Sequence, residues 1–176
     1  MKNQKTTVNY IACGAMIAAL YAGATWGCAA FGAAFGPVQL RLSEALMSLC
    51  VFTPAAVPGL AIGCLLGNIS SPYGAADIVL GSAATLLAAL SGRKLRNICV
   101  KGIPVLSLLM PVIFNAVFIG AEIAFFAGSQ ASFEAFVLAA AEIAASEAIA
   151  CLVGGTVLVK VIGKSKRLMN LFNQKR

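Results

Sequence analysis

Carboxylates that interrupt apolar sequence are the residues most able to do chemistry in this chain. Glu122 follows Asn115 by seven residues, which is two helical turns, so both side chains are expected on one helix face. Glu147 lies in a later apolar run, and Glu142, five residues earlier, would point about 140° away from it. A carboxylate removed from water needs a donor or a cationic partner. We therefore expect Glu122 and Glu147 to bind a ligand or a coupling ion.

Other charged residues stand where apolar runs begin. Asp77 opens one run and could bind a ligand or simply cap a helix. Arg41 and Glu44 open another run, three residues apart on one helix face, and could form part of a site or an ion pair that anchors the helix end. Glu134 is expected in a solvated loop. Aromatic residues that could stack on a planar ligand, or serve only in packing, are Trp26, Tyr73 and Phe114.

Several enzymatic mechanisms lack the residues they require. Without histidine there is neither a zinc HExxH site nor a Ser–His dyad, and a single aspartate excludes an aspartyl pair. Gly163-Lys164-Ser165 ends like a nucleotide-binding P-loop, but the position of its first glycine holds Leu158. The six cysteines stand singly, which does not favour a metal site or a disulfide framework. We expect no enzymatic activity and no cofactor.

The composition identifies the elements that would position these residues. Of 176 residues, 60% are hydrophobic and only 11% are charged, which is too little polar surface for a soluble domain. The net charge of +7 comes from bases confined to short segments between apolar runs, so we expect no nucleic-acid-binding surface. The chain is predicted to be an all-α, polytopic membrane protein.

Three basic clusters determine the predicted topology, because positive loops stay cytoplasmic. An even number of crossings must separate any two cytoplasmic clusters, so the run 42–69 is expected to supply two helices rather than one. This run is also too long for one straight helix across a ~30 Å hydrocarbon core. Prolines in the segment Thr53–Pro58 predict a break there. The prediction is a single domain, residues 1–176, with both termini cytoplasmic and six spans at about 10–33, 38–53, 55–70, 76–92, 103–127 and 135–162.

Small residues at four-residue intervals mark two possible helix-packing faces. One motif consists of Gly59, Gly63 and Gly67, and the other consists of Ala15, Ala19 and Gly23. Such stripes serve either packing within the chain or the docking of another membrane subunit. Both interpretations stay open on the spacing alone.

Five segments, in order along the chain, resemble the QueT-type queuosine-precursor transporters. These transporters are substrate-binding S components of bacterial energy-coupling factor (ECF) transporters. The resemblance covers about residues 10–160, and its most specific part is the Arg-x-Ser-Glu-Ala-Leu segment. Ser146 stands where the family pattern has glycine. The segments are Phe35–Leu46, Phe52–Gly59, Asp77–Ser82, Pro111–Ala116 and Ser146–Cys151.

The resemblance implies a partner complex of one transmembrane coupling subunit and two ATPases in the cell membrane. It implies six helices with cytoplasmic termini and a site near the external face, covered by the loop after the first helix. It also implies that small residues on the first helix, here Ala15, Ala19 and Gly23, contact the coupling subunit. The implied ligand is a 7-deazaguanine such as 7-aminomethyl-7-deazaguanine or queuine.

The expected site suits such a ligand. A carboxylate, Glu147 or Glu122, would accept the paired N–H donors of the guanine-like edge, and an amide would serve the neighbouring carbonyl. A second carboxylate would face a cationic substituent. Alternatives are an S component for another vitamin, an ion-coupled solo transporter and a non-transporting scaffold. The expected substrate-binding residues are Glu122, Glu147, Asn115, Asp77, Arg41, Glu44 and Phe114.

Overall fold

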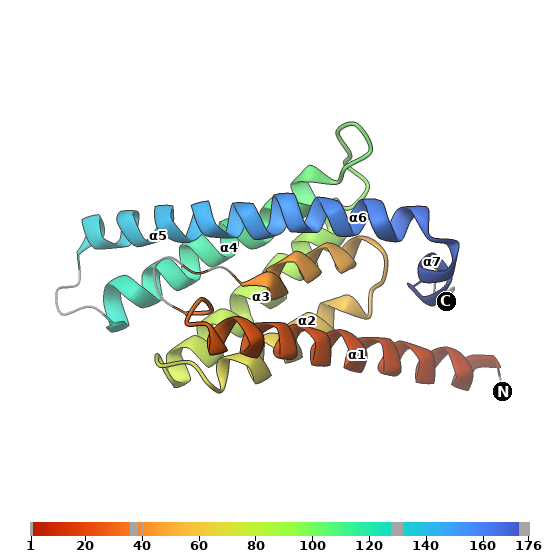
Figure 1. Ribbon diagram of the computed structural model, residues 1–176, viewed down its shortest axis with the longest axis horizontal. Helices are drawn as coiled ribbons and strands as arrows, with labels where there is room; N and C mark the ends of the chain where they lie inside the picture. Colours follow the sequence, from red (N-terminus) through yellow and green to blue (C-terminus); the bar gives the residue numbers. More distant parts are fainter. Residues whose placement is uncertain (1, 36–38, 40, 128–131, 173–176) are drawn as a thin grey trace.

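A computed structural model describes residues 2–35, 39, 41–127 and 132–172, and Figure 1 shows these segments as an elongated helical bundle. Side chains are described from Thr7 onward, except that of Ala127. Two of the short helices, η2 and η3, are π-helical, and η1 is a 3-10 helix. In order, the elements are α1 (Lys2–Ala30), η1 (Leu42–Val51), α2 (Ala56–Asn68), α3 (Ala75–Leu95), α4 (Val105–Glu122), η2 (Ile123–Ala127), α5 (Phe133–Ala148), η3 (Ile149–Gly154), α6 (Gly155–Lys164) and α7 (Lys166–Phe172).

Four helical stretches in the described part of the chain are long and apolar enough to cross a bilayer, which makes this a multi-pass membrane protein. The two helices from the run 42–69 are shorter than the predicted spans 38–53 and 55–70. With ten residues in η1 and thirteen in α2, each reaches only about 20 Å. Six crossings therefore remain a prediction. The long stretches are Thr7–Ala30, Ala75–Leu95, Val105–Phe126 and Phe133–Lys164.

The predicted break between Thr53 and Pro58 is confirmed. The chain turns between η1 and α2, where Thr53 Oγ1 accepts a hydrogen bond from the Ala55 backbone N–H at 3.3 Å. Pro58 lies in the first turn of α2, where a helix tolerates the missing N–H group. In Figure 1 this turn, the α3–α4 loop and both ends of the chain lie toward one end of the bundle. The C-terminal end of α1 and the α2–α3 loop lie toward the other end.

The glycine motif of α2 packs within the chain, against α1. A methyl group on Gly63 would lie 2.7 Å from Tyr21 Cβ and 2.9 Å from the Ala18 carbonyl oxygen. A methyl group on Gly59 would lie 2.6 Å from the carbonyl oxygen of Gly14. Only glycine allows this close approach of the two backbones. Packing within the chain is therefore the role of this motif.

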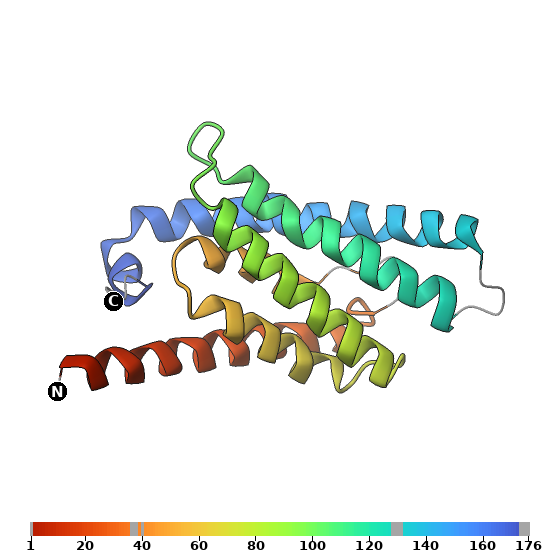
Figure 2. The ribbon, with the colours of Figure 1, turned by 180° about the vertical axis from the view of Figure 1, so that it is seen from behind.

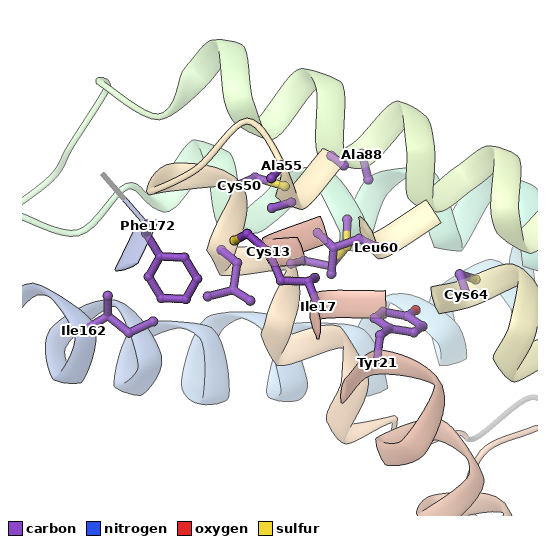
Figure 3. Packing of buried hydrophobic residues seen from close by; sticks show 14 residues of the cluster. Cys13, Ile17, Tyr21, Cys50, Ala55, Leu60, Cys64, Ala88, Ile162 and Phe172 are labelled. Atoms are coloured by element: carbon purple, nitrogen blue, oxygen red, sulfur yellow. The ribbon is translucent and has the colours of Figure 1, made fainter. Parts of the chain in front are cut away.

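The helices α1 to α5 pack in chain order, and η1 lies among them. Figure 2, which views the bundle from behind, shows α3 and α4 side by side on the face nearer the viewer. The 3-10 helix η1 contacts α1, α2, α3, α4, η3 and α6. Apolar side chains fill the space around it, and Figure 3 shows Phe172 of α7 entering this core near Ile162. Polar side chains on η1 are therefore surrounded by protein from every side.

Candidate functional site

Five charged side chains of the described residues are buried, and each has at most 5% of its surface exposed. They come from four different parts of the chain, namely the start of η1, α3, α4 and α5. Four are acids and one is a base. Each was predicted from sequence as a site residue. The five are Arg41, Glu44, Asp77, Glu122 and Glu147.

Arg41 pairs with Asp77, so the alternative in which Arg41 and Glu44 form an ion pair is wrong. Its Nη2 atom lies 3.5 Å from Asp77 Oδ2, and its Nε–H donates to the Ala34 carbonyl oxygen at 2.6 Å. The guanidinium also lies 5.0 Å from the centre of the Phe35 ring. Arg41 stands at the N-cap of η1 in extended conformation, which directs its side chain away from the helical register of Glu44. The base therefore ties η1 to α3.

Asp77 does not cap its helix, so that alternative is wrong. Gly74 occupies the N-cap position of α3 with a positive φ of 65°, and Asp77 lies inside the first turn. The Asn68 amide, Nδ2, donates to the Asp77 backbone oxygen at 2.9 Å and to Oδ1 at 3.3 Å. A methyl group on Gly81 would lie 2.5 Å from that nitrogen. The absence of a side chain at Gly81 therefore makes room for the Asn68–Asp77 pair.

Glu44 and Glu147 meet at the centre of the bundle. A side-chain oxygen of each and the Cys151 sulphur all lie within 4.8 Å of one another. The Tyr21 hydroxyl donates to Glu44, and the Cys151 thiol lies 3.6 Å from Glu147 Oε2 as a weak donor. The side-chain amide of Asn115 interacts with both carboxyl groups. Residues from α1, η1, α4, α5 and η3 therefore converge on two carboxyl groups.

Close backbone packing brings this pair together. A methyl group on Gly154 would lie 2.9 Å from Ala45 Cβ, and one on Gly155 would lie 2.9 Å from Leu108 Cδ2. These glycines follow Glu147 at the end of η3 and the start of α6. They allow the continuous helical stretch Phe133–Lys164, formed by α5, η3 and α6, to approach η1, because no side chain separates the two.

Glu122 differs from the other acids because neither of its side-chain oxygens has a hydrogen-bond partner among the described residues, although both are buried. It borders a pocket of about 450 Å³ that also contacts Pro72, Tyr73, Ala76 and Phe126. The pocket lies where the α2–α3 loop meets the end of α4, at the end of the bundle away from the termini. The geometry offers a carboxylate acceptor beside two aromatic rings.

Other predicted residues lie outside the group of five buried charged side chains and its immediate neighbours. Phe114 packs against the apolar core and its ring centre is 6.5 Å from that of Phe118. Glu134 is exposed as predicted, but it lies in the first turn of α5 after the capping residue Ser132, so its placement in a loop is wrong. Glu142 is half-buried on another face of α5. Ala15, Ala19 and Gly23 are exposed on α1.

Two predicted loops fall partly outside the described residues. The loop expected to cover the site includes residues 36–38 and 40, and the loop before α5 includes residues 128–131. The final bases, Lys175 and Arg176, are likewise outside the described part of the chain. The cover over the site therefore remains an expectation.

The five buried charged side chains and the polar groups that contact them form the polar centre of the bundle. Three of its side chains were not predicted from sequence. Tyr21 and Asn68 are polar residues within apolar runs, and that pattern was the available signal for both. Cys151 carried no such signal, because a thiol packs as readily as a small apolar side chain. Its role follows from its position one turn after Glu147.

Comparison with known proteins agrees with the resemblance of the sequence motifs. Residues 11–164 match the family described as QueT transporter, which covers every element from most of α1 to the end of α6. Neither a curated protein nor a solved structure matches the chain significantly. The match extends over most of the chain and includes all five buried charged residues, and so this protein belongs to the QueT transporter family.

Proposed function

We propose that this protein is the substrate-binding S component of an ECF-type transporter in the bacterial cell membrane. It binds a 7-deazaguanine, such as 7-aminomethyl-7-deazaguanine or queuine, and delivers it inward with a transmembrane coupling subunit and two ATPases. Membership of the QueT transporter family supports a transport role rather than an enzymatic one. The four buried acids support a ligand rich in N–H donors or positive charge.

The observation that carries the proposal is the unpartnered carboxylate of Glu122 at the pocket. Burying a carboxylate without hydrogen-bond donors destabilises the folded protein unless a ligand supplies those donors. The guanine-like edge of a deazaguanine offers adjacent N–H groups that two carboxylate oxygens accept together. Tyr73 and Phe126 border the same pocket, and their faces suit a flat heterocycle. We therefore assign the paired N–H donors to Glu122.

The remaining polar groups have complementary roles in this proposal. Asn115 would serve a carbonyl or ring nitrogen, because an amide can both donate and accept. Asp77 already has Arg41 as its cationic partner, so Glu44 and Glu147 are better placed to attract a positive substituent. Arg41 would offset the negative charge of Asp77, its partner in the ion pair.

The docking of partners is assigned to α1. Its inner face packs on the α2 glycines, whereas Ala15, Ala19 and Gly23 are exposed and no atom lies within 4 Å of a methyl group placed on Gly23. A stripe of small residues lets another helix approach closely. We therefore assign this stripe to the coupling subunit.

Titration calorimetry on the purified protein tests the ligand assignment. The wild type should bind 7-aminomethyl-7-deazaguanine, and Glu122→Gln should weaken binding because the amide presents a donor to the ligand's own donors. Truncating one side of a buried charged hydrogen bond costs ~2–5 kcal/mol, or roughly 30-fold to several-thousand-fold in affinity. Glu134→Gln, an exposed change of the same chemistry, is the control and should bind normally. Wild-type affinity in a well-folded Glu122→Gln variant would contradict the assignment.

A further inference from the structure

The contact between Glu44 and Glu147 has an electrostatic consequence beyond ligand recognition. The two side chains have 1% and 3% of their surface exposed, and their oxygens approach within 4.8 Å. Two negative charges at this separation repel strongly where water cannot screen them. In addition, Glu44 Oε2 is buried and has no hydrogen-bond partner among the described residues. The pair therefore lacks the donors that two ionised carboxylates would need.

The surrounding groups do not supply the missing positive charge. Tyr21 of α1 and Cys151 of η3 are neutral donors, Cys64 of α2 is a neutral thiol, and Asn115 of α4 is an amide. The acid of α3, Asp77, is negative and has its own partner.

Arg41 is the one buried base among the described side chains. Its guanidinium attracts both glutamates, but its ion pair and hydrogen bond are made with Asp77 and the Ala34 carbonyl. One positive charge thus stands against four buried acids.

We propose that Glu44 and Glu147 together form a site for one exchangeable proton, which the pair holds when the protein is empty and releases when a cationic ligand binds. This inference rests on the proposed function and extends it. One carboxyl group carries the proton as O–H and the other remains an anion, as in acid pairs that share a site. When an ammonium group enters the centre, the O–H bond ionises and the proton leaves to solvent. The total charge of the centre is then unchanged.

The exchange of this proton for a cationic group makes binding depend on the charge of the ligand. A ligand with an ammonium substituent gains the attraction of the newly formed carboxylate, whereas a neutral ligand would leave the proton in place. The protein should therefore favour an amine-bearing 7-deazaguanine over one with a neutral substituent of similar size. A primary ammonium stays protonated until about pH 10, so the ligand itself does not titrate between pH 6 and 8.

Calorimetry of the wild type between pH 6 and 8 tests the exchange without any substitution. The protein is titrated with 7-aminomethyl-7-deazaguanine or the neutral 7-cyano-7-deazaguanine. Buffers of different ionisation enthalpy reveal the number of protons released, and EDTA in each buffer removes metal ions. For the amine, we expect release of about one proton and an affinity that rises up to tenfold per pH unit, since a released proton is favoured at higher pH. For the cyano compound, we expect no release and an affinity that changes less than about twofold.

Substitutions locate the proton. Glu44→Gln and Glu147→Gln each leave a single acid, which needs no shared proton, so both variants should release none and lose the pH dependence for the amine. Glu142→Gln is the matched control, because Glu142 lies on the same helix as Glu147 but is only half-buried. It should release the same number of protons as the wild type.

The possible failures are distinguishable. Binding of both compounds with no proton release in the wild type would overturn the proton site and leave the proposed function standing. Proton release that persists in both Gln variants would also overturn it, because the proton would then reside elsewhere. Failure of the wild type to bind either compound would reject the proposed function itself.

Discussion

Arg41 and Asn68 hold the Asp77 carboxylate in place, and a glycine makes this arrangement possible. Asn68 Nδ2 donates to two oxygens of Asp77 and lies directly over Gly81. A methyl group on Gly81 would also lie 3.1 Å from Asp77 Oδ1. The space above Gly81 is therefore as important to the polar centre as the charged groups themselves.

At this position, Gly81→Ala should displace the Asn68 amide and break its hydrogen bonds to Asp77. Overpacking a tight site and losing a buried hydrogen bond each cost about 1–3 kcal/mol, so the midpoint of thermal unfolding should fall. The control is Gly27→Ala on α1, where a methyl group meets no atom within 4 Å and alanine favours the helix. Differential scanning fluorimetry in detergent would compare the two. Equal stability of Gly81→Ala and the wild type would refute the steric argument.

Two faces of the helix α1 have different roles. On one face, the Tyr21 hydroxyl donates to Glu44 and Thr25 Oγ1 lies 2.9 Å from Ser43 Oγ, so hydrogen bonds from both residues connect α1 to η1. The other face carries the exposed stripe of small residues. A single rigid helix thus connects the polar centre with the surface proposed for the coupling subunit.

Replacing Ala15 or Ala19 by Trp should separate these two roles. The bulky ring keeps another helix away, so co-purification with the coupling subunit and uptake should both fall. Ligand binding by the isolated protein should persist, because both side chains point away from the polar centre. The corresponding substitution on an exposed apolar residue of another helix, Val79→Trp, is the control. Loss of ligand binding with assembly intact would assign the stripe to the core instead.

Across the whole molecule, η1 is the element that the other helices enclose. A ten-residue 3-10 helix is unusually long, and its poorer hydrogen-bond geometry must be compensated by packing on all sides. Its C-terminal carbonyl groups receive further donors, since Arg93 Nη1 lies 2.9 Å from the Cys50 oxygen and 3.0 Å from that of Val51. The bundle thereby holds Glu44 at its centre.

Membrane orientation can be tested with a native residue, because Cys99 is exposed in the α3–α4 loop and the other five cysteines are buried. If this loop is cytoplasmic, a membrane-impermeant maleimide should label intact cells poorly and permeabilised cells well. In a Cys99→Ser background, Pro72→Cys should show the opposite pattern, since Pro72 is exposed and belongs to the α2–α3 loop, which lies toward the other end of the bundle. Labelling of Cys99 in intact cells would refute the predicted orientation.

Local sequence determined the helical class, the apolar runs and the break between Thr53 and Pro58, since composition and proline act within a few residues of themselves. It also marked the buried acids, because a charge in apolar sequence is conspicuous wherever the chain folds. The glycine spacing of α2 indicated a close helix contact, although it did not name the partner helix.

Only the tertiary structure decided which charges meet. Arg41 and Glu44 are three residues apart, yet Arg41 pairs with Asp77, because extended backbone at the N-cap of η1 directs it toward α3. Glu44 meets Glu147 across more than a hundred residues, because Gly154 at the end of η3 and Gly155 at the start of α6 allow close packing against η1. Electrostatic partners are chosen by distance in space, and spacing along a chain reports that distance only within one regular helix.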